Sequence, residues 1–200
     1  MSDQNKVSGV VLAGGQARRM QQQDKGLVLF KQRPLVSYPI AALAAVTNHL
    51  VISANRNQAI YQQWQYPVIS DASDDFDGPL AGILAALEYL DAEVLLVLPC
   101  DSPLFTAAHL QQLLEGLTEQ FDIAVAYDGE RLHPVFLAVR SELKNSLKAY
   151  LASGERRLQN WIFQHRVNQV DFSQQAQIFS NVNTLAELER LEAESKPLWA

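Results

Sequence analysis

The sequence Leu12-Ala13-Gly14-Gly15-Gln16-Ala17-Arg18-Arg19-Met20 joins an apolar run to a group of cations, and Asp24-Lys25 follows it. The apolar run, residues 7–12, predicts a buried strand. Paired glycines after a strand let the backbone turn sharply and bring its N–H groups against a ligand, because no Cβ stands in the way. Backbone donors beside Arg and Lys side chains suit a polyphosphate. The alternative is a tight strand-to-helix turn with solvated arginines.

Short apolar runs alternate with amphipathic stretches along the rest of the chain. The predicted strands are Gly9–Leu12, Leu50–Ser53, Pro67–Ser70, Val94–Leu98, Ile123–Tyr127, Val135–Val139 and Val167–Asp171, with a short extra strand at Leu27–Phe30. The predicted helices are Leu35–Val46, Gln58–Trp64, Leu80–Leu90, Ala107–Thr118, Ser141–Ala152, Arg157–His165 and Leu185–Ala193. This alternation predicts an α/β fold with a Rossmann-like, mostly parallel sheet and helices on both faces. A length of 200 residues suits a single domain.

Composition narrows the classes of protein that the chain can belong to. The content of 48% hydrophobic and 19% charged residues is ordinary for a soluble globular protein. No apolar run approaches the length of a membrane span, and the first residues do not form a signal peptide. The single cysteine, Cys100, excludes an internal disulfide framework. We therefore expect a cytoplasmic monomer that does not contact a membrane.

The charge is unevenly distributed. The formal net charge is −6, yet residues 18–33 hold five cations and one acidic residue, so they carry +4 and the remainder carries −10. A nucleic-acid duplex would require a broad basic face. An acidic chain with one basic segment instead predicts a small anionic ligand and no nucleic-acid partner.

The polar ends of the predicted strands indicate where that ligand binds. Ligands of open α/β sheets bind beyond the carboxyl ends of the parallel strands. The loops after Leu12, Ser53, Ser70 and Leu98 should therefore share one edge of the sheet.

Asp101 is the candidate metal ligand at this edge. It follows the strand predicted at Val94–Leu98 and stands between Pro99 and Pro103, which stiffen the backbone. Mg²⁺ takes one or two protein carboxylates and completes its octahedron with phosphate oxygens and water. The alternative is an Asp that caps the next turn. The four His residues and Cys100 show no zinc-like spacing, and His133, before Pro134, is more typical of a packing or turn residue.

The motifs together resemble the molybdenum cofactor guanylyltransferases of the molybdopterin nucleotidyltransferase family. The resemblance rests on L-A-G-G-x-A-R-R-M with D-K-G, on P-C-D-x-P at residues 99–103, and on G-P-L-A-G at residues 78–82. It extends to G-E-R-R at residues 154–157 and N-V-N-T at residues 181–184, and so covers nearly the whole chain. The chain departs from the family at Gln21, where Gly is usual, and at Ser53, where N-x-N-R is more common.

The resemblance implies transfer of GMP from Mg-GTP to the terminal phosphate of molybdenum-bearing molybdopterin, which yields molybdopterin guanine dinucleotide and pyrophosphate. It implies catalytic roles for Arg19, Lys25 and Asp101, with Asp101 holding Mg²⁺. The implied nucleotide-binding residues are Leu12, Ala13, Gly14, Gly15, Lys25, Ser53, Asn55, Asp71 and Asp101. The implied molybdopterin-binding residues are Gly78, Gly82, Arg156, Asn181 and Asn183. The first half of the domain would thus bind GTP and the second half molybdopterin.

The sequence leaves three other functions open. A molybdopterin cytidylyltransferase usually reads L-A-A-G where this chain has L-A-G-G. A sugar-1-phosphate nucleotidyltransferase usually has a longer chain and the loop G-x-G-T-R-L. The third is a non-catalytic nucleotide-binding chaperone of molybdoenzyme assembly. For the guanylyltransferase, molybdopterin-insertion proteins and molybdoenzyme chaperones are the expected partners.

Overall fold

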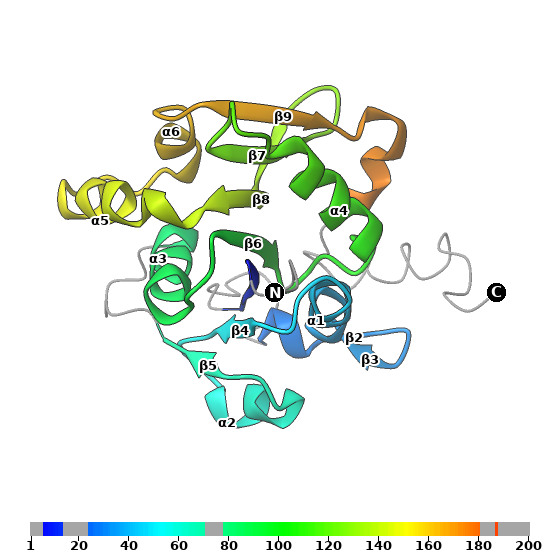
Figure 1. Ribbon diagram of the computed structural model, residues 1–200. Helices are drawn as coiled ribbons and strands as arrows, with labels where there is room; N and C mark the ends of the chain where they lie inside the picture. The colour runs from blue at the N-terminus through cyan, green and yellow to red at the C-terminus, as the bar shows by residue number, and fades with distance from the viewer. Residues whose placement is uncertain (1–5, 14–23, 71–77, 181–186, 188–200) are drawn as a thin grey trace.

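A seven-stranded sheet in the order β5-β4-β1-β6-β8-β7-β9 forms the centre of the molecule (Figure 1). This computed structural model describes residues 6–13, 24–70, 78–180 and 187. The strands are β1 Val7–Leu12, β4 Leu50–Ser53, β5 Val68–Ile69, β6 Val94–Pro99, β7 Ile123–Tyr127, β8 Leu132–Arg140 and β9 Val167–Asp171. A separate hairpin pairs β2, Leu29–Phe30, with β3, Arg33–Pro34.

The sheet is mostly parallel, as the sequence predicts. β5, β4, β1 and β6 pair in parallel, and so do β7 and β9. Only β8 runs against its neighbours β6 and β7. Its direction follows from the short connection at residues 128–131, because a parallel partner needs a crossover of a dozen or more residues. Within this connection, the Asp128 carboxylate accepts hydrogen bonds from the backbone N–H groups of Glu130 and Arg131.

Helices cover both faces of the sheet, which confirms the predicted layers. The helices are α1 Ser37–Ala44, α2 Gln58–Tyr61, α3 Pro79–Tyr89, α4 Ala107–Gly116, α5 Lys144–Ala152 and α6 Leu158–Ile162. Short 3₁₀ helices lie at Lys25–Leu27, Gln62–Trp64, Ser141–Leu143 and Ser173–Phe179. In Figure 1, α1 and α4 lie on one side of the sheet and α3, α5 and α6 on the other. Among the described residues, no helix combines the length and apolar character that crossing a membrane requires.

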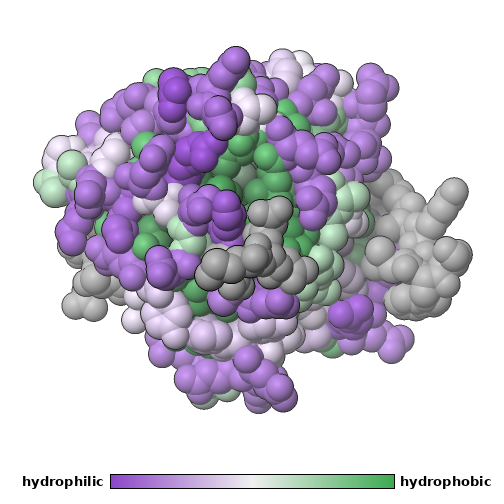
Figure 2. Space-filling view, in the orientation of Figure 1, coloured by the Kyte–Doolittle hydropathy of each residue, from purple (hydrophilic) through white to green (hydrophobic). Residues whose placement is uncertain are grey.

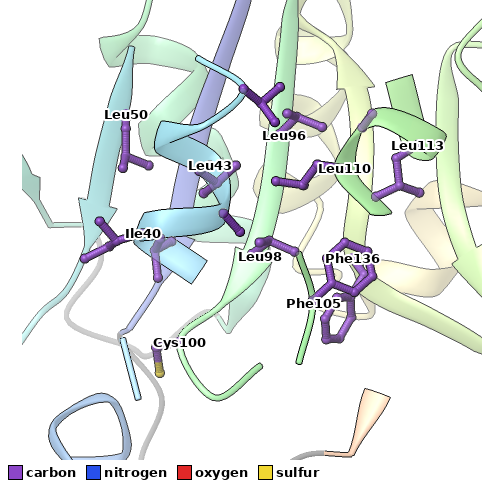
Figure 3. Packing of buried hydrophobic residues seen from close by; sticks show 14 of the residues in the cluster. Ile40, Leu43, Leu50, Leu96, Leu98, Cys100, Phe105, Leu110, Leu113 and Phe136 are labelled. Carbon is purple, nitrogen blue, oxygen red and sulfur yellow. The ribbon is translucent and has the colours of Figure 1, made fainter. Parts of the chain in front are cut away.

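Two hydrophobic cores result, one on each face. Successive strand residues point to opposite faces, so Val11 and Leu96 join one cluster, whereas Val10 and Leu95 join the other. Figure 3 shows the first cluster, in which side chains of α1 and α4 pack against those of β6. The surface seen in Figure 2 is largely hydrophilic, and hydrophobic residues show mainly in a central hollow.

The predicted elements are present, but several ends differ. β8 begins at Leu132 and not at Val135, and the helix predicted from Leu35 begins at Ser37. The predicted strand at residues 27–30 is divided between a 3₁₀ turn and β2. The helix predicted at Leu185–Ala193 lies outside the described residues, apart from position 187. The 3₁₀ helix at Ser173–Phe179 was not predicted, because it is short and only Ile178 and Phe179 are buried.

His133 has the packing role that its sequence context predicts. The ring is buried and stacks on Phe179, with ring centroids 3.8 Å apart. Its Nε2 lies 2.6 Å from Oδ2 of Asp128. His133 therefore ties the β7–β8 connection to the C-terminal 3₁₀ helix.

An ion pair between Asp122 and Arg166 fixes the edge strand β9 beside β7. The Asp122 carboxylate accepts from the Arg166 backbone N–H at 3.0 Å and from its guanidinium. These hydrogen bonds from Arg166 are the main reason that the pKa of Asp122 lies below its ordinary value. Asp122 is buried, so its charge depends on this partner.

We predict that Asp122→Asn lowers the free energy of unfolding by about 1–2 kcal/mol at pH 7, near the lower end of the range for hydrogen bonds to charged groups, because the Arg166 side chain is 61% exposed. Because the folded pKa of Asp122 is depressed, its contribution is complete above the unfolded pKa and is lost as pH falls through the folded pKa. Denaturant unfolding at several pH values should therefore show the variant and wild type converging below about pH 4. A difference that stays constant down to pH 2 would contradict the role of the ion pair.

Candidate functional site

The carboxyl ends of four parallel strands meet at one edge of the sheet, as predicted. Leu12 at the end of β1 pairs in register with Ser53 of β4 and with Pro99 of β6, and Ser53 pairs with Ile69 of β5. The chain continues this pairing past the strand ends. Ala13 N–H donates to the Ser53 carbonyl at 2.8 Å, and Cys100 N–H donates to the Leu12 carbonyl at 3.0 Å. The segments that follow these strands therefore begin side by side.

The start of α3 packs closely against this edge. A Cβ added to Gly82 would lie 2.7 Å from the Ser53 Oγ and 2.9 Å from the Leu12 Cδ2. Three predicted site residues are thus in direct contact, and a side chain at position 82 would separate them. Pro79 occupies the first turn of α3, which is the helix initiation that its position suggests. Gly78 precedes it with φ 70°, a conformation that other residues rarely adopt.

Lys25 and Asp101 form an ion pair at the same edge, although 76 residues separate them in sequence. Their side chains are only 22% and 10% exposed, respectively. Asp101 follows β6 in a turn in which the Ser102 hydroxyl donates to the Pro99 carbonyl at 2.7 Å. Lys25 lies in a single 3₁₀ turn, Lys25–Leu27, for which Asp24 is the N-cap. The structure therefore joins the predicted phosphate-binding cation to the predicted metal ligand.

Asp101 is a described residue at this edge that could contribute to holding a divalent metal ion. Asp101 supplies a hard oxygen donor, and its carboxylate is already balanced by a cation. In the described part of the chain, no group of three His, Cys, Asp or Glu residues could hold a metal.

Cys100, next to Asp101, is a packing residue. Burial, reinforced by the negative charge of Asp101, raises the pKa of the Cys100 thiol above its ordinary range. The thiol is therefore protonated at neutral pH and is a poor nucleophile. In Figure 3 its side chain lies beyond the end of β6, at the border of the apolar cluster.

The sequence does not indicate two residues that contact this site, Tyr61 and Asn57. The Asp24 carboxylate accepts hydrogen bonds from the Tyr61 hydroxyl and from the Asn57 side-chain amide. Tyr61 belongs to α2 and appeared in the sequence only as part of an amphipathic helix. No local pattern indicates that its hydroxyl faces a loop 37 residues earlier in the chain.

The predicted molybdopterin-binding residue Arg156 lies on an exposed turn after α5. β8 ends at the amino edge of the sheet, where Arg140 pairs with Val94, and the 3₁₀ turn Ser141–Leu143 and then α5 follow it. The Arg156 guanidinium donates to the carbonyls of Leu151 and Glu155 at 2.8 and 2.9 Å. Gly154 adopts φ 88° in this turn.

Several predicted site residues lie outside the described residues. They are Gly14, Gly15, Arg19, Asp71, Asn181 and Asn183. Asn55 is described and lies half-buried after β4.

The chain is similar in sequence to known proteins over most of its length. Residues 9–170 match the family described as MobA-like NTP transferase domain. The chain is 42% identical over 187 residues to a protein of Shewanella sediminis (strain HAW-EB3) named molybdenum cofactor guanylyltransferase, which covers 93% of this chain and 95% of that one. It is 44% identical over 188 residues to a protein of the same name from Histophilus somni (strain 2336), with 93% and 96% covered.

Solved structures share the fold at lower sequence identity. The crystal structure of molybdopterin-guanine dinucleotide biosynthesis protein A from Archaeoglobus fulgidus superimposes with a TM-score of 0.77 at 22% identity, over 93% of this chain and 97% of that one. The 4-diphosphocytidyl-2C-methyl-D-erythritol synthase from Anaerococcus prevotii gives a TM-score of 0.73 at 12% identity, over 94% of each chain. With the family match over residues 9–170 and relatives above 40% identity, the chain belongs to the MobA-like NTP transferase family and is a nucleotidyltransferase.

Proposed function

We propose that this protein is a molybdenum cofactor guanylyltransferase that transfers GMP from GTP to molybdenum-bearing molybdopterin and releases pyrophosphate. The observation that carries the proposal is the Lys25–Asp101 pair at the carboxyl edge of the sheet. It occurs in a chain whose relatives at 42% and 44% identity are named for this activity.

The reaction is an in-line attack of a phosphate oxygen of molybdopterin on the α-phosphorus of GTP. Such chemistry depends on positioning and on neutralisation of charge more than on a covalent group. Lys25 would bind phosphate oxygens of GTP, and Arg19 would add a second positive charge. Asp101 would hold Mg²⁺, which when bound supplies charge neutralisation at the triphosphate. The attacking phosphate is already ionised at neutral pH, so no strong general base is needed.

The first half of the chain would bind the nucleotide. Gly14 and Gly15 would present backbone N–H groups to the phosphates, and Asn55 and Asp71 would contact the guanosine. A carboxylate such as Asp71 can accept from both N–H groups on one edge of guanine, a pairing that adenine does not offer. Leu12, Ala13 and Ser53 would hold this edge together, since the Ser53 carbonyl accepts from Ala13 N–H and the Ser53 side chain is buried against α3.

The second half would bind molybdopterin. Arg156 would contact the substrate phosphate, and the amides of Asn181 and Asn183 match the donors and acceptors of a pterin. Gly78, where an added Cβ would meet nothing within 4 Å, would let the substrate approach the start of α3, and the buried Gly82 would act by keeping that helix close to Ser53 and Leu12. We expect the reaction in the cytoplasm, where GTP is available, with molybdopterin-insertion proteins and molybdoenzyme chaperones as partners of the monomer.

Nucleotide preference is the most direct test of this function, because the shared fold does not identify the base. Equilibrium titration with GTP, CTP, ATP and UTP in the presence of Mg²⁺ should give the tightest binding for GTP, by at least about tenfold, a difference of about 1.4 kcal/mol. Pyrophosphate release should require both GTP and molybdopterin. Tighter binding of CTP would favour a cytidylyltransferase, and GTP binding without pyrophosphate release would favour a chaperone.

We predict that Asp101→Asn lowers turnover on the order of a thousandfold, because the charge that develops on pyrophosphate loses its metal. Steady-state kinetics and circular dichroism of the purified variant would measure turnover and fold. Asp91→Asn, at an exposed position before β6, is the matched control and should keep wild-type turnover. Wild-type turnover in Asp101→Asn would refute the metal role.

We also predict that Gly82→Ala destabilises the protein by about 1–3 kcal/mol, because the added methyl group overpacks the contact with Ser53 and Leu12. Thermal or denaturant unfolding would measure this change. Ser53→Ala in the same chain removes the nearest atom, the Oγ at 2.7 Å, and should restore part of the loss. Equal stability of Gly82→Ala and wild type would show that the start of α3 adjusts freely.

A further inference from the structure

The turn that carries Lys25 is fixed at its backbone. Gly26 N–H donates to the Asp24 Oδ1 at 3.2 Å, and Leu27 N–H donates to the Asp24 carbonyl at 3.0 Å. The Gly26 carbonyl in turn accepts from Val36 N–H at 2.9 Å. These bonds hold the backbone of the turn, but they do not by themselves determine where the turn sits relative to Asp101.

Side chains from the segment after β4 hold the carboxylate that caps this turn. The Tyr61 hydroxyl donates to the Asp24 Oδ1 at 2.5 Å, and the Asn57 Nδ2 donates to the Asp24 Oδ2 at 2.9 Å. Tyr61 is completely buried. Asn57 adopts φ 52°, a conformation that Asn tolerates better than most residues. Both carboxylate oxygens of Asp24 therefore have a partner outside their own turn.

The packing around Gly26 shows that the turn Lys25–Leu27 lies between α2 and the segment after β6. A Cβ on Gly26 would lie 2.5 Å from the Tyr61 Oη and 3.3 Å from the Cys100 Cβ. Tyr61 thus contacts one side of the turn, and the residue before Asp101 contacts the other. A small displacement of Tyr61 would move the turn relative to the end of β6.

The hydrogen bonds to Asp24 also affect which of two carboxylates, Asp24 or Asp101, pairs with the Lys25 ammonium group. Asp24 is adjacent in sequence to Lys25 and could pair with its ammonium group. With its oxygens engaged by Tyr61, Asn57 and Gly26, Asp24 leaves the ammonium group to Asp101. Burial is the main cause that raises the pKa of Tyr61 above its ordinary range, and the nearby Cys100 and Asp24 raise it further. The Tyr61 hydroxyl therefore stays protonated and remains a hydrogen-bond donor.

We propose that Tyr61 and Asn57 are positioning residues that act through Asp24 to direct the Lys25 ammonium group to Asp101 and to the phosphates of the nucleotide. The phosphate part of this inference rests on the proposed function. Asn57 is two residues from Asn55, so the same segment joins the predicted nucleotide-binding loop to the catalytic lysine. Neither residue needs to touch the substrate.

Tyr61→Phe removes the hydroxyl and keeps the ring, and Asn57→Gly removes the amide while preserving the left-handed backbone. Tyr38→Phe is the matched control, because that buried hydroxyl donates to the Phe30 carbonyl at 2.7 Å and not to Asp24. Brief acetylation of the full-length protein, followed by mass spectrometry, measures the reactivity of Lys25 without any substrate. We expect severalfold faster labelling of Lys25 in Tyr61→Phe and Asn57→Gly, and wild-type labelling in Tyr38→Phe.

Kinetics distinguish positioning from a loss of stability. Tyr61→Phe should lower kcat about ten- to a hundredfold, as expected when a catalytic group is displaced by about 1 Å. In a Lys25→Ala background the same change should alter kcat less than about twofold, because residues that act through one another are not additive. Full additivity of the two changes would overturn the proposal, and so would unchanged Lys25 labelling in Tyr61→Phe. A wild type that neither binds GTP nor releases pyrophosphate would refute the proposed function, while the labelling result would still decide the positioning role.

Discussion

The in-register parallel pairing of β1 with β4 and β6 is the constraint on which the rest of the structure depends. Parallel neighbours cannot be joined by a tight turn, so each connection crosses over the sheet and covers a face with a helix. Because the strands point the same way and end together at Leu12, Ser53 and Pro99, their loops open on one edge. The candidate site is a consequence of this pairing, since it brings Lys25 and Asp101, which are 76 residues apart in sequence, to one edge.

Electrostatic attraction at this edge stabilises the contact between Lys25, from the basic segment, and Asp101. A lysine and an aspartate that are both largely buried would be costly alone, and their contact offsets part of that cost. Removal of one partner would leave the other charge buried and unpaired, so the two residues are expected to act as a unit.

The reversal at β8 divides the sheet into a parallel part and a second part that consists of β8, β7 and β9. The four strands β5, β4, β1 and β6 build the edge that holds Lys25 and Asp101. The antiparallel pair of β7 and β8 is followed by α5, Lys144–Ala152, and by the exposed turn that carries Arg156. Buried aromatic contacts, including the stacking of His133 on Phe179, attach the C-terminal segment to this second part.

The sequence by itself determined the layers, the mostly parallel sheet, and the edge at which the candidate site residues after β1, β4 and β6 lie. These follow from local signals, since hydrophobic periodicity reports burial and the alternation of strands with helices reports the layers. The tertiary structure alone decided the contact of Gly82 with Ser53 and the hydrogen bond from the Tyr61 hydroxyl to Asp24. Those contacts depend on which surfaces meet after the chain crosses over the sheet. The contact between residues 24 and 61 leaves no periodic pattern in the sequence, because a single hydroxyl hardly changes the hydrophobicity or the helix propensity of its segment.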